Sequence, residues 1–167
     1  MFFMNTITYR VGDATRPQHE GQKIIAHICN DSGGWGRGFV LALSKRSKAP
    51  ESAFRSWFAT GIGFRLGAVQ FVGIDEETEV ANIIGQHGII RKNDPPNKPP
   101  PVRYEAIQEG LRAVAQRALE RGATVHMPRI GSGLAGGNWE IIVSIIEDEL
   151  CAHDVRVFVY DLEPRSR

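Results

Sequence analysis

Two glycine-rich turns, about a hundred residues apart, hold the residue types best suited to binding a phosphorylated ligand. They are HICNDSGGWGRGF at residues 27–39 and PRIGSGLAGGNW at residues 128–139. Each follows a short apolar run typical of a buried strand and precedes a stretch with helical periodicity. Backbone N–H groups that no Cβ obstructs can wrap a phosphate at such a helix N-terminus. Two turns of this kind indicate a ligand held from both sides, such as a diphosphate-bridged nucleotide.

The common phosphate-binding motifs do not account for these turns. Neither contains the G-x-x-x-x-G-K-[ST] pattern, so the lysine with which P-loop proteins reach the β- and γ-phosphates is missing. Residues 131–136 match the dinucleotide fingerprint G-x-G-x-x-G literally. However, the stretch that follows keeps a helical pattern up to Asp148 and Cys151, so no acidic residue ends a strand about twenty residues later. A different nucleotide-binding fold is required.

The elements that must position the turns alternate between strands and helices. Continuous apolar runs predict buried strands at residues 7–11, 23–29, 68–74, 80–84, 124–127 and 155–160. Helical patterns lie between them, which favours an α/β fold: a three-layer α/β/α sandwich with a mixed, mostly parallel sheet. The uninterrupted pair 68–74 and 80–84 should form an antiparallel hairpin.

Periodicity also predicts which helix faces pack on the sheet. Weaker helical patterns cover 39–45 and 51–60. The clearest helix has one apolar stripe, made of Tyr104, Ile107, Leu111, Val114, Ala118 and Leu119. The last helix opens at Asn138, a suitable N-cap, with Glu140 in its first turn. Its inward-facing residues are Ile142, Ile145, Ile146 and Leu150.

A proline-rich segment interrupts this pattern. Residues 91–101, RKNDPPNKPPP, hold five of the nine prolines and cannot form regular structure. The segment follows a strand end near the glycine-rich turns. It could serve as a lid over the ligand or as an inert surface connector.

The composition sets the broad class of the protein. At 167 residues the chain suits one domain, spanning 1–167, and is short for two. Twenty basic and nineteen acidic residues leave a net charge of +1 without a block of like charge, so nucleic acid is not the expected partner. Cys29 and Cys151 make neither a disulfide framework nor a zinc-binding pair. With no leader or membrane-spanning run in the sequence, we expect a cytoplasmic monomer.

Taken together, these motifs resemble the macrodomain, the ADP-ribose-binding module, over residues 7–162. The resemblance rests on the opening strand that ends in Gly12-Asp13-Ala14, on both glycine-rich turns, and on the closing strand VFVY at 157–160. The first turn is most similar to the branch that contains an ADP-ribose-1''-phosphate phosphatase and a terminal ADP-ribose protein glycohydrolase. The expected ligand is therefore ADP-ribose.

The resemblance implies a role for each part of the ligand site. Asp13 would accept a hydrogen bond from the adenine amine, with the Ala14 backbone against the ring, and Tyr160 and Leu162 would close the adenine pocket. Backbone groups of the second turn would cradle the diphosphate: Gly131, Ser132, Gly133, Leu134, Ala135 and Gly136. The first turn would enclose the distal ribose: Asn30, Gly34, Trp35, Gly36, Gly38 and Phe39. By residue type alone, Asp13 is also an ordinary turn residue and Tyr160 an ordinary core residue.

The resemblance is less specific about the reaction. The glycohydrolase uses a lysine near the end of the strand matched here by 80–84 and an aspartate in its second turn. This chain has Gln86 or His87 at the first place and Ala135 at the second. Two routes remain open. A water held by the first turn and a ligand phosphate oxygen could attack, or a histidine could act as general base.

The candidate general base is His27, which matches a histidine of the phosphatase branch, with Asp31 or His87 nearby. Histidine suits this work because it titrates close to neutral pH. His27 could equally be a buried strand histidine hydrogen-bonded to backbone, and His87 an exposed turn residue. Cys29 has no partner in the sequence that would favour its thiolate, so it fits a small buried residue better than a nucleophile.

We therefore expect an ADP-ribosyl hydrolase that removes mono-ADP-ribose from acidic side chains of modified proteins, without a metal or other cofactor. Its partner would be ADP-ribose or an ADP-ribosylated protein, with no membrane involved. ADP-ribose-1''-phosphate and O-acetyl-ADP-ribose are alternative substrates for the same site. The competing class is a module that binds ADP-ribose without chemistry. The missing lysine and aspartate favour that binding module, whereas a short chain with no further domain favours the enzyme.

Overall fold

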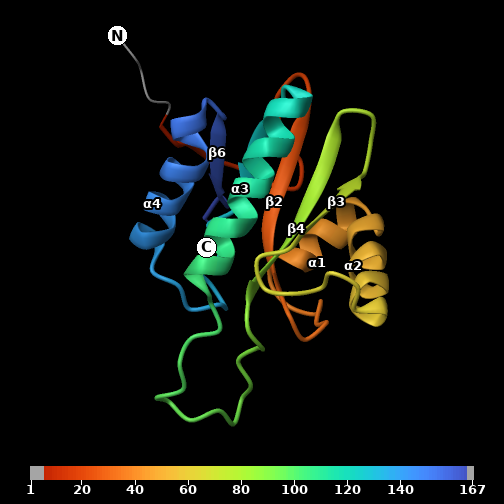
Figure 1. Ribbon diagram of the computed structural model, residues 1–167. Coiled ribbons are helices and arrows are strands. Elements are labelled where there is room, and N and C mark those ends of the chain that lie inside the picture. The colour runs from red at the N-terminus through yellow and green to blue at the C-terminus, as the bar shows by residue number, and fades with distance from the viewer. Residues whose placement is uncertain (1–5, 165–167) are drawn as a thin grey trace.

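The computed structural model describes residues 6–164. Within this range the chain forms six strands and four α-helices (Figure 1). The limits of the expected domain, 1 and 167, lie outside this range. The elements in chain order are β1 (Thr8–Val11), β2 (Lys23–Asn30), α1 (Phe39–Arg46), α2 (Ala49–Thr60), β3 (Val69–Gly73), β4 (Thr78–Gln86), α3 (Tyr104–Arg121), β5 (Thr124–Met127), α4 (Trp139–Glu149), the short 3₁₀ helix η1 (Cys151–His153) and β6 (Val157–Asp161).

All six strands belong to one sheet, in the order β1-β6-β5-β2-β4-β3. Neighbouring strands are parallel except β3 and β4, which form the predicted antiparallel hairpin. Strand β2 lies between β5 and β4, and its side chains are nearly all buried. A strand covered on both faces needs apolar residues on both, which explains its uninterrupted apolar run.

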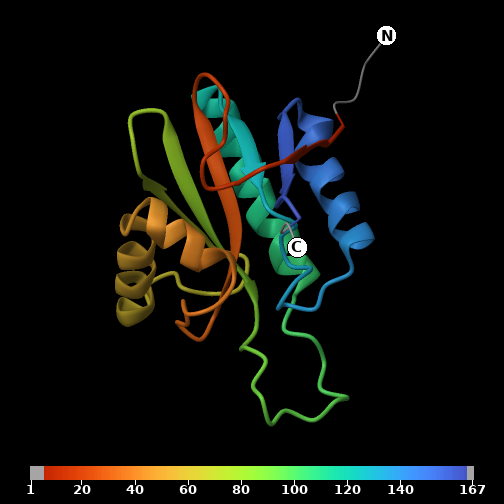
Figure 2. The ribbon, with the colours of Figure 1, turned by 180° about the vertical axis from the view of Figure 1, so that it is seen from behind.

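Helices cover both faces of the sheet (Figures 1 and 2). Ile24 and Ala26 of β2 pack in the larger core cluster with residues of α3 and α4. Ile25 and Cys29, which point to the other face, pack in a second cluster with residues of α1 and α2. The three-layer α/β/α sandwich with a mixed, mostly parallel sheet is therefore confirmed.

The apolar stripe predicted for α3 is buried, except for its last residue. Ile107, Leu111, Val114 and Ala118 are buried against the sheet. The prediction for Leu119 is wrong, because its side chain is 57% exposed. Successive helical residues are about 100° apart, so a residue directly after Ala118 is turned away from the stripe.

Strand β4 is longer than its apolar run because it takes in a buried acid, Glu79. The Glu79 carboxylate accepts hydrogen bonds from the Arg117 guanidinium at 2.9 and 2.7 Å. Arg121 lies 3.1 Å away and adds a second positive charge. These hydrogen bonds from Arg117 outweigh the effect of burial and lower the pKa of Glu79. Apolar periodicity cannot predict a buried charge whose partners lie about forty residues away.

The carboxyl ends of β2, β4, β5 and β6 meet at one edge of the sheet, because these strands run parallel. Ligands of open α/β sheets bind at this edge. The first glycine-rich turn leaves β2 there. The second leaves β5 on one side of β2, and the proline-rich segment follows β4 on the other side. Among residues 6–164, no helix combines the length and apolar character needed to cross a membrane.

Candidate functional site

Two internal hydrogen bonds shape the second glycine-rich turn. The Gly136 N–H donates to the Gly133 carbonyl at 3.0 Å, and the Gly137 N–H donates to the Gly131 carbonyl at 2.7 Å. The N–H groups of Gly131, Gly133, Leu134 and Ala135, in the middle of the turn, have no acceptor within residues 6–164. A Cβ added at Gly133 would meet nothing within 4 Å. The turn therefore presents free donors beside open space, as an anion-binding turn requires.

The second turn leads directly into the N-terminus of α4. Asn138 is the N-cap, as predicted, since its Oδ1 accepts a hydrogen bond from the Glu140 N–H at 2.9 Å. The Asn138 N–H donates to the Tyr104 hydroxyl oxygen at 2.9 Å, which ties the end of the turn to α3. The positive end of the α4 dipole thus lies beside the free N–H groups of the turn.

The first glycine-rich turn folds around the Asn30 side chain. Asn30 Oδ1 accepts hydrogen bonds from the N–H groups of Ser32 at 3.0 Å and Gly34 at 2.9 Å, and Asn30 Nδ2 donates to the Gly34 carbonyl at 2.9 Å. The Asn30 side chain, which was expected at the distal ribose, thus makes its hydrogen bonds within the turn itself. The backbone N–H groups of residues 35–39 have no acceptor in the described part of the chain.

Two aromatic side chains pack between this turn and the helices α1 and α2. Trp35 is 4% exposed, and its indole N–H donates to Ser44 Oγ at 2.8 Å. Phe58 of α2 lies against Gly33, where an added Cβ would come within 2.5 Å of the phenyl ring. The Trp35 ring therefore packs beneath the turn, and its backbone N–H has no acceptor within residues 6–164.

The two turns approach each other across the sheet edge. A Cβ added at Gly38 would lie 3.4 Å from Leu134 Cδ1. Gly38 has φ +78°, a conformation that other residues rarely adopt. The structure thus brings the two turns into contact at Gly38 and Leu134.

The residues expected at the adenine end divide into a turn and an apolar cluster. Asp13 Oδ1 accepts hydrogen bonds from the Thr15 N–H at 2.8 Å and the Thr15 hydroxyl at 2.7 Å. Ala14 packs with Phe158 and Tyr160. Asp13 is therefore a turn residue, as its type suggested, and Asp13 Oδ2 accepts no hydrogen bond within residues 6–164.

Tyr160 is held by a buried histidine that the sequence analysis did not single out. Tyr160 is 7% exposed, and its hydroxyl lies 2.8 Å from His126 Nδ1. His126 stacks on Phe158 with the ring centroids 4.9 Å apart. Phe39 packs on the cluster from α1, whereas Leu162 is 78% exposed. Ala14, Phe39 and Tyr160 are thus brought together, and Leu162 extends from the strand end into solvent.

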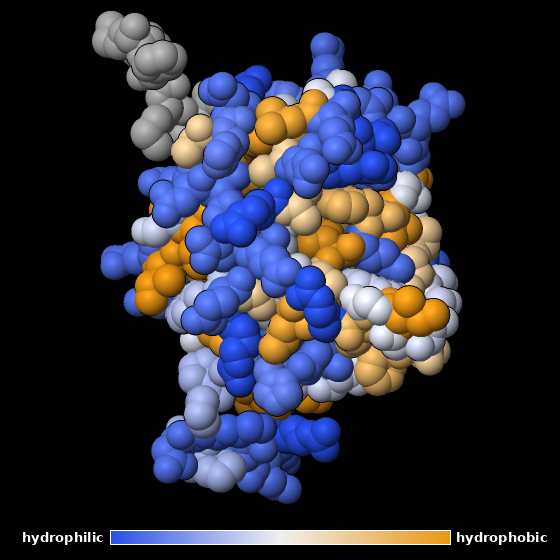
Figure 3. All heavy atoms as spheres, viewed as in Figure 1, coloured by the Kyte–Doolittle hydropathy of each residue, from blue (hydrophilic) through white to orange (hydrophobic). Residues whose placement is uncertain are grey.

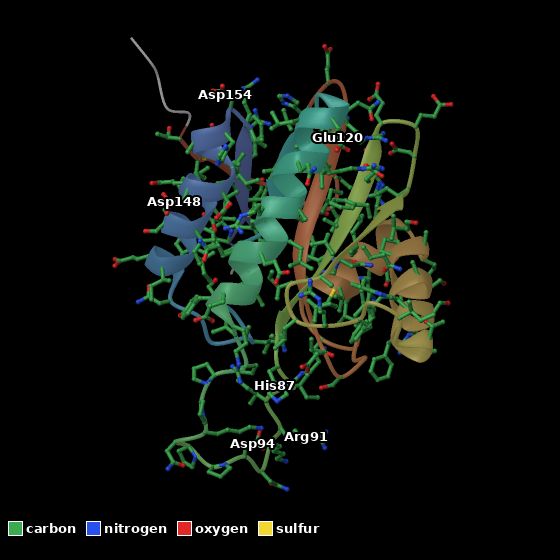
Figure 4. All side chains as sticks on the ribbon, in the orientation of Figure 1. His87, Arg91, Asp94, Glu120, Asp148 and Asp154 are labelled. Carbon is green, nitrogen blue, oxygen red and sulfur yellow. The ribbon has the colours of Figure 1, made fainter. Side chains whose placement is uncertain are left out.

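Asp31, in the first glycine-rich turn, and His87, directly after β4, form a hydrogen-bonded pair. His87 Nδ1 lies 2.7 Å from Asp31 Oδ2, and Asp31 Oδ1 accepts from the Gly88 N–H at 2.8 Å. Partial burial opposes ionisation of Asp31, but the Gly88 N–H and the His87 ring outweigh it, so the pKa of Asp31 lies below its ordinary value. The His87 side chain is 64% exposed at the base of the proline-rich segment (Figure 4).

This pair has the geometry of a general base with its orienting carboxylate. A carboxylate only accepts hydrogen bonds, so His87 Nδ1–H donates to Asp31 and the lone pair of a neutral ring lies on Nε2. Backbone hydrogen bonds also connect the pair to the end of β4 and to the proline-rich segment. The Asp31 N–H donates to the Gln86 carbonyl at 3.0 Å, and the His87 N–H donates to the Pro101 carbonyl at 2.8 Å.

A cavity lies elsewhere, at the opposite edge of the sheet. It measures about 470 Å³ and is lined by the start of β2 and the turn before β4. Its basic side chains are already paired, Lys23 with Glu77 and Arg46 with Asp75. Its lining also includes Glu76 and leaves no basic side chain unpaired for a diphosphate. We therefore place the site at the glycine-rich turns.

Two solved structures are similar to this chain over nearly their whole length. A protein of unknown function from Bacteroides thetaiotaomicron is 52% identical, with a TM-score of 0.90, over 95% of this chain and 99% of that chain. A macrodomain protein from Streptomyces coelicolor is 51% identical, with a TM-score of 0.81, over 93% of this chain and 98% of that chain. The chain belongs to the macrodomain family. No protein-family model matches the sequence of this macrodomain.

Curated relatives of this macrodomain share shorter or more distant similarity. The mouse chromodomain-helicase-DNA-binding protein 1-like is 31% identical over 97% of this chain, which spans only 18% of that protein's length. The bovine ADP-ribose glycohydrolase OARD1 is 39% identical over 44% of this chain and 47% of its own length. An ADP-ribose 1''-phosphate phosphatase from Lodderomyces elongisporus is 25% identical over 93% of this chain and 99% of its own.

Of the two positions where the family resemblance implies a catalytic lysine and an aspartate, the first corresponds in this macrodomain to Gln86 or His87 and the second to Ala135. The Gln86 side chain donates to the Gly88 carbonyl at 3.0 Å. The Ala135 side chain is buried in the larger core cluster. Cys29 is 3% exposed, and burial raises the pKa of its thiol, as expected of a small core residue. The exposed imidazole next to Gln86 belongs to His87.

His27 is a buried strand histidine in this macrodomain, and the structure does not bring it to Asp31 or His87. Its Nε2 lies 2.5 Å from Asn82 Oδ1, and the ring packs edge-on against Trp35. Asn82 Nδ2 donates to the Pro50 carbonyl, so Asn82 Oδ1 accepts and His27 Nε2 donates. The sequence analysis expected a backbone partner for a buried His27, whereas the partner is a side-chain amide. Nδ1 has no partner within the described residues.

Burial of His27 and His126 predicts a pH-dependent stability. Burial lowers the pKa of His27 to about 4 and of His126 to about 3, from an ordinary 6.5. The unfolded chain then binds more protons than the folded one below pH 6.5, so the free energy of unfolding falls with the pH. Between about pH 7.5 and 5, the burial of each neutral ring should lower the free energy of unfolding by about 2 kcal/mol. Urea titrations across this range measure the loss, and His27→Gln should reduce it. An equal loss in that variant would contradict the assignment.

Other residues that shape the site gave no signal in the sequence. Phe58 supports Gly33, and Pro100 packs on Gly136, where an added Cβ would lie 3.0 Å from Pro100 Cβ. Arg129, which starts the second turn, donates two hydrogen bonds to Asp161 at 2.7 and 3.0 Å. Each contact joins segments that are distant along the chain, so residue type alone could not identify it.

Proposed function

We propose that this macrodomain binds ADP-ribose across its two glycine-rich turns and hydrolyses the ester that joins the distal ribose to an acidic side chain of a modified protein. The observation that carries the proposal is the Asp31–His87 pair, which joins the first glycine-rich turn to the end of β4, in a turn whose N–H groups at residues 35–39 have no acceptor within residues 6–164. The names of two relatives, an ADP-ribose glycohydrolase and an ADP-ribose 1''-phosphate phosphatase, support a hydrolytic site for this ligand class.

Each turn supplies donors to a different part of the ligand. The free N–H groups of the second turn and the N-terminus of α4 bind the diphosphate. The free N–H groups of residues 35–39 face the distal ribose, close to Asp31 in the same turn. Ala14, Phe39 and Tyr160 provide an apolar surface for adenine. The turns use backbone atoms, so glycines can line the site without side chains that would fill it.

The pair then activates water. Asp31 holds Nδ1–H of His87, so Nε2 accepts a proton from a water molecule placed beside the distal ribose. The water oxygen forms a bond to the anomeric carbon, and the bond from that carbon to the carboxylate oxygen breaks. The carboxylate leaves as an anion and needs no proton. Free ADP-ribose and the unmodified acidic side chain result, and His87 returns its proton to solvent.

A reader that binds ADP-ribose without turnover is the competing function. It is favoured by the buried Ala135 side chain and by the hydrogen-bonded Gln86 amide. The exposed imidazole oriented by a carboxylate favours the enzyme, because a reader has no use for such a pair.

One set of assays separates these functions. The protein is incubated with a glutamate-linked mono-ADP-ribosylated peptide and, separately, with ADP-ribose-1''-phosphate, while calorimetry measures ADP-ribose binding. We expect binding together with release of ADP-ribose from the peptide. Tight binding without turnover of either substrate would establish the reader, and turnover of the phosphate ester alone would establish a phosphatase. Failure to bind ADP-ribose would refute the proposed ligand.

A further inference from the structure

We propose, on the basis of the function above, that residues 89–101 form a recognition arm for the acidic polypeptide that surrounds a modified side chain. This arm projects from the carboxyl edge of the sheet (Figures 1 and 2). It contains Arg91, Lys92 and Lys98 and one acid, Asp94. Its net charge of +2 exceeds the +1 of the whole chain. The space-filling view shows it as a strongly hydrophilic projection (Figure 3).

The base of the arm contacts both parts of the site. The Pro101 carbonyl accepts a hydrogen bond from the His87 N–H at 2.8 Å, next to the proposed general base. Pro100 packs on Gly136 of the second turn. The Arg103 guanidinium donates to the carbonyls of Pro100, Pro101 and Val102 at 2.8, 3.0 and 3.0 Å. A polypeptide whose modified side chain enters the site must therefore pass close to the arm.

Internal hydrogen bonds hold the arm in shape. Asp94 Oδ2 accepts from the Arg91 N–H at 2.6 Å and from Lys98 Nζ at 3.0 Å. The Lys98 N–H donates to the Pro95 carbonyl at 3.0 Å. Prolines restrict the backbone further, so little conformational entropy is lost when a partner binds. An inert connector needs no such organisation.

Two basic side chains of the arm remain free for a partner. Lys98 is paired with Asp94. The side chains of Arg91 and Lys92 are exposed and make no hydrogen bond or ion pair within residues 6–164. Figure 4 shows Arg91 and Asp94 in the arm, with His87 at its base. Free guanidinium and ammonium groups beside the site are complementary to carboxylates.

The composition of the arm favours a polypeptide over a nucleic acid. Single-stranded nucleic acids bind through aromatic stacking as well as charge, and residues 89–101 contain no aromatic residue. Ile89 and Ile90, which are 37% and 48% exposed, add apolar surface next to the basic pair. A polypeptide with both acidic and apolar side chains fits this combination.

The test compares binding of three probes to the full chain. The first is free ADP-ribose. The other two are peptides that carry ADP-ribose through a nonhydrolysable amide, one with glutamate-rich flanks (the acidic peptide) and one with neutral flanks (the neutral peptide). The wild type should bind the acidic peptide about tenfold more tightly than the neutral one, and raising salt from about 50 to about 300 mM should remove the difference. Arg91→Glu with Lys92→Glu should abolish the preference without changing affinity for free ADP-ribose. Lys45→Glu with Lys48→Glu makes the same charge change at two exposed positions, in the last turn of α1 and at the N-cap of α2, and should have no effect.

Equal wild-type affinity for both peptides would overturn the proposal, as would loss of the preference in the Lys45/Lys48 variant. A single-stranded oligonucleotide that outcompetes the acidic peptide through Arg91 and Lys92 would overturn it in favour of a nucleic acid. If the wild type prefers the acidic peptide through Arg91 and Lys92 but releases no ADP-ribose from a modified peptide, only the proposed hydrolysis is refuted. If ADP-ribose does not bind, the proposed function fails, and binding of the unmodified acidic peptide tests the arm alone.

Discussion

Replacing Gly133 with valine should abolish ADP-ribose binding while leaving the fold intact. A Cβ at this position meets nothing within 4 Å, and Gly133 does not have a positive φ, so the chain accepts the side chain. The new methyl groups would occupy the space in front of the free N–H groups of the second turn. Loss of two hydrogen bonds to a charged diphosphate costs about 3 to 6 kcal/mol, a loss in affinity of about 100-fold or more.

Calorimetry with ADP-ribose measures this loss, and a thermal unfolding curve checks the fold. Gly73→Val is the matched control, because Gly73 lies in β3, also has open space around its Cβ position and also lacks a positive φ. The control should bind ADP-ribose like the wild type. Wild-type affinity in the Gly133 variant would show that the diphosphate does not lie on the second turn.

Replacing His87 with asparagine should reduce kcat by about 100-fold or more without changing ADP-ribose affinity. An asparagine Nδ2 can still donate to Asp31 in the manner of His87 Nδ1, but no basic nitrogen remains in the place of Nε2. Asp31→Asn should reduce kcat to a similar extent. Its amide can still accept from the Gly88 N–H, but it no longer holds the proton on Nδ1 of His87.

Single-turnover release of ADP-ribose from the glutamate-linked peptide measures both variants. Because the two residues act as a unit, the double variant should be no slower than either single one. His153→Asn, in η1, is the control for loss of an exposed histidine and should keep full activity. Wild-type kcat in the His87 variant would favour the other route, in which the first turn and a ligand phosphate oxygen hold the water.

The sequence by itself determined where the two glycine-rich turns lie and which layers support them. Continuous apolar runs before both turns predicted parallel strands buried on both faces, and the carboxyl ends of such strands meet at one edge. The N-cap at Asn138 was predictable because capping depends on residues within one helical turn. The strand limits differed where polar residues such as Glu79 are buried, since their partners lie on α3.

Only the tertiary structure decided which side chains face the site. His27 and Asp31 lie four residues apart, yet His27 is 1% exposed in the α1 and α2 layer and Asp31 reaches His87. The register of β2 on β4 shifts between Cys29 and Asn30, so Asn30 pairs with Gln86, and Asp31 and His87 follow these two residues. Register between strands more than fifty residues apart depends on packing of the whole sheet. The glycine-rich turns could therefore be located from local sequence, whereas the Asp31–His87 pair could not.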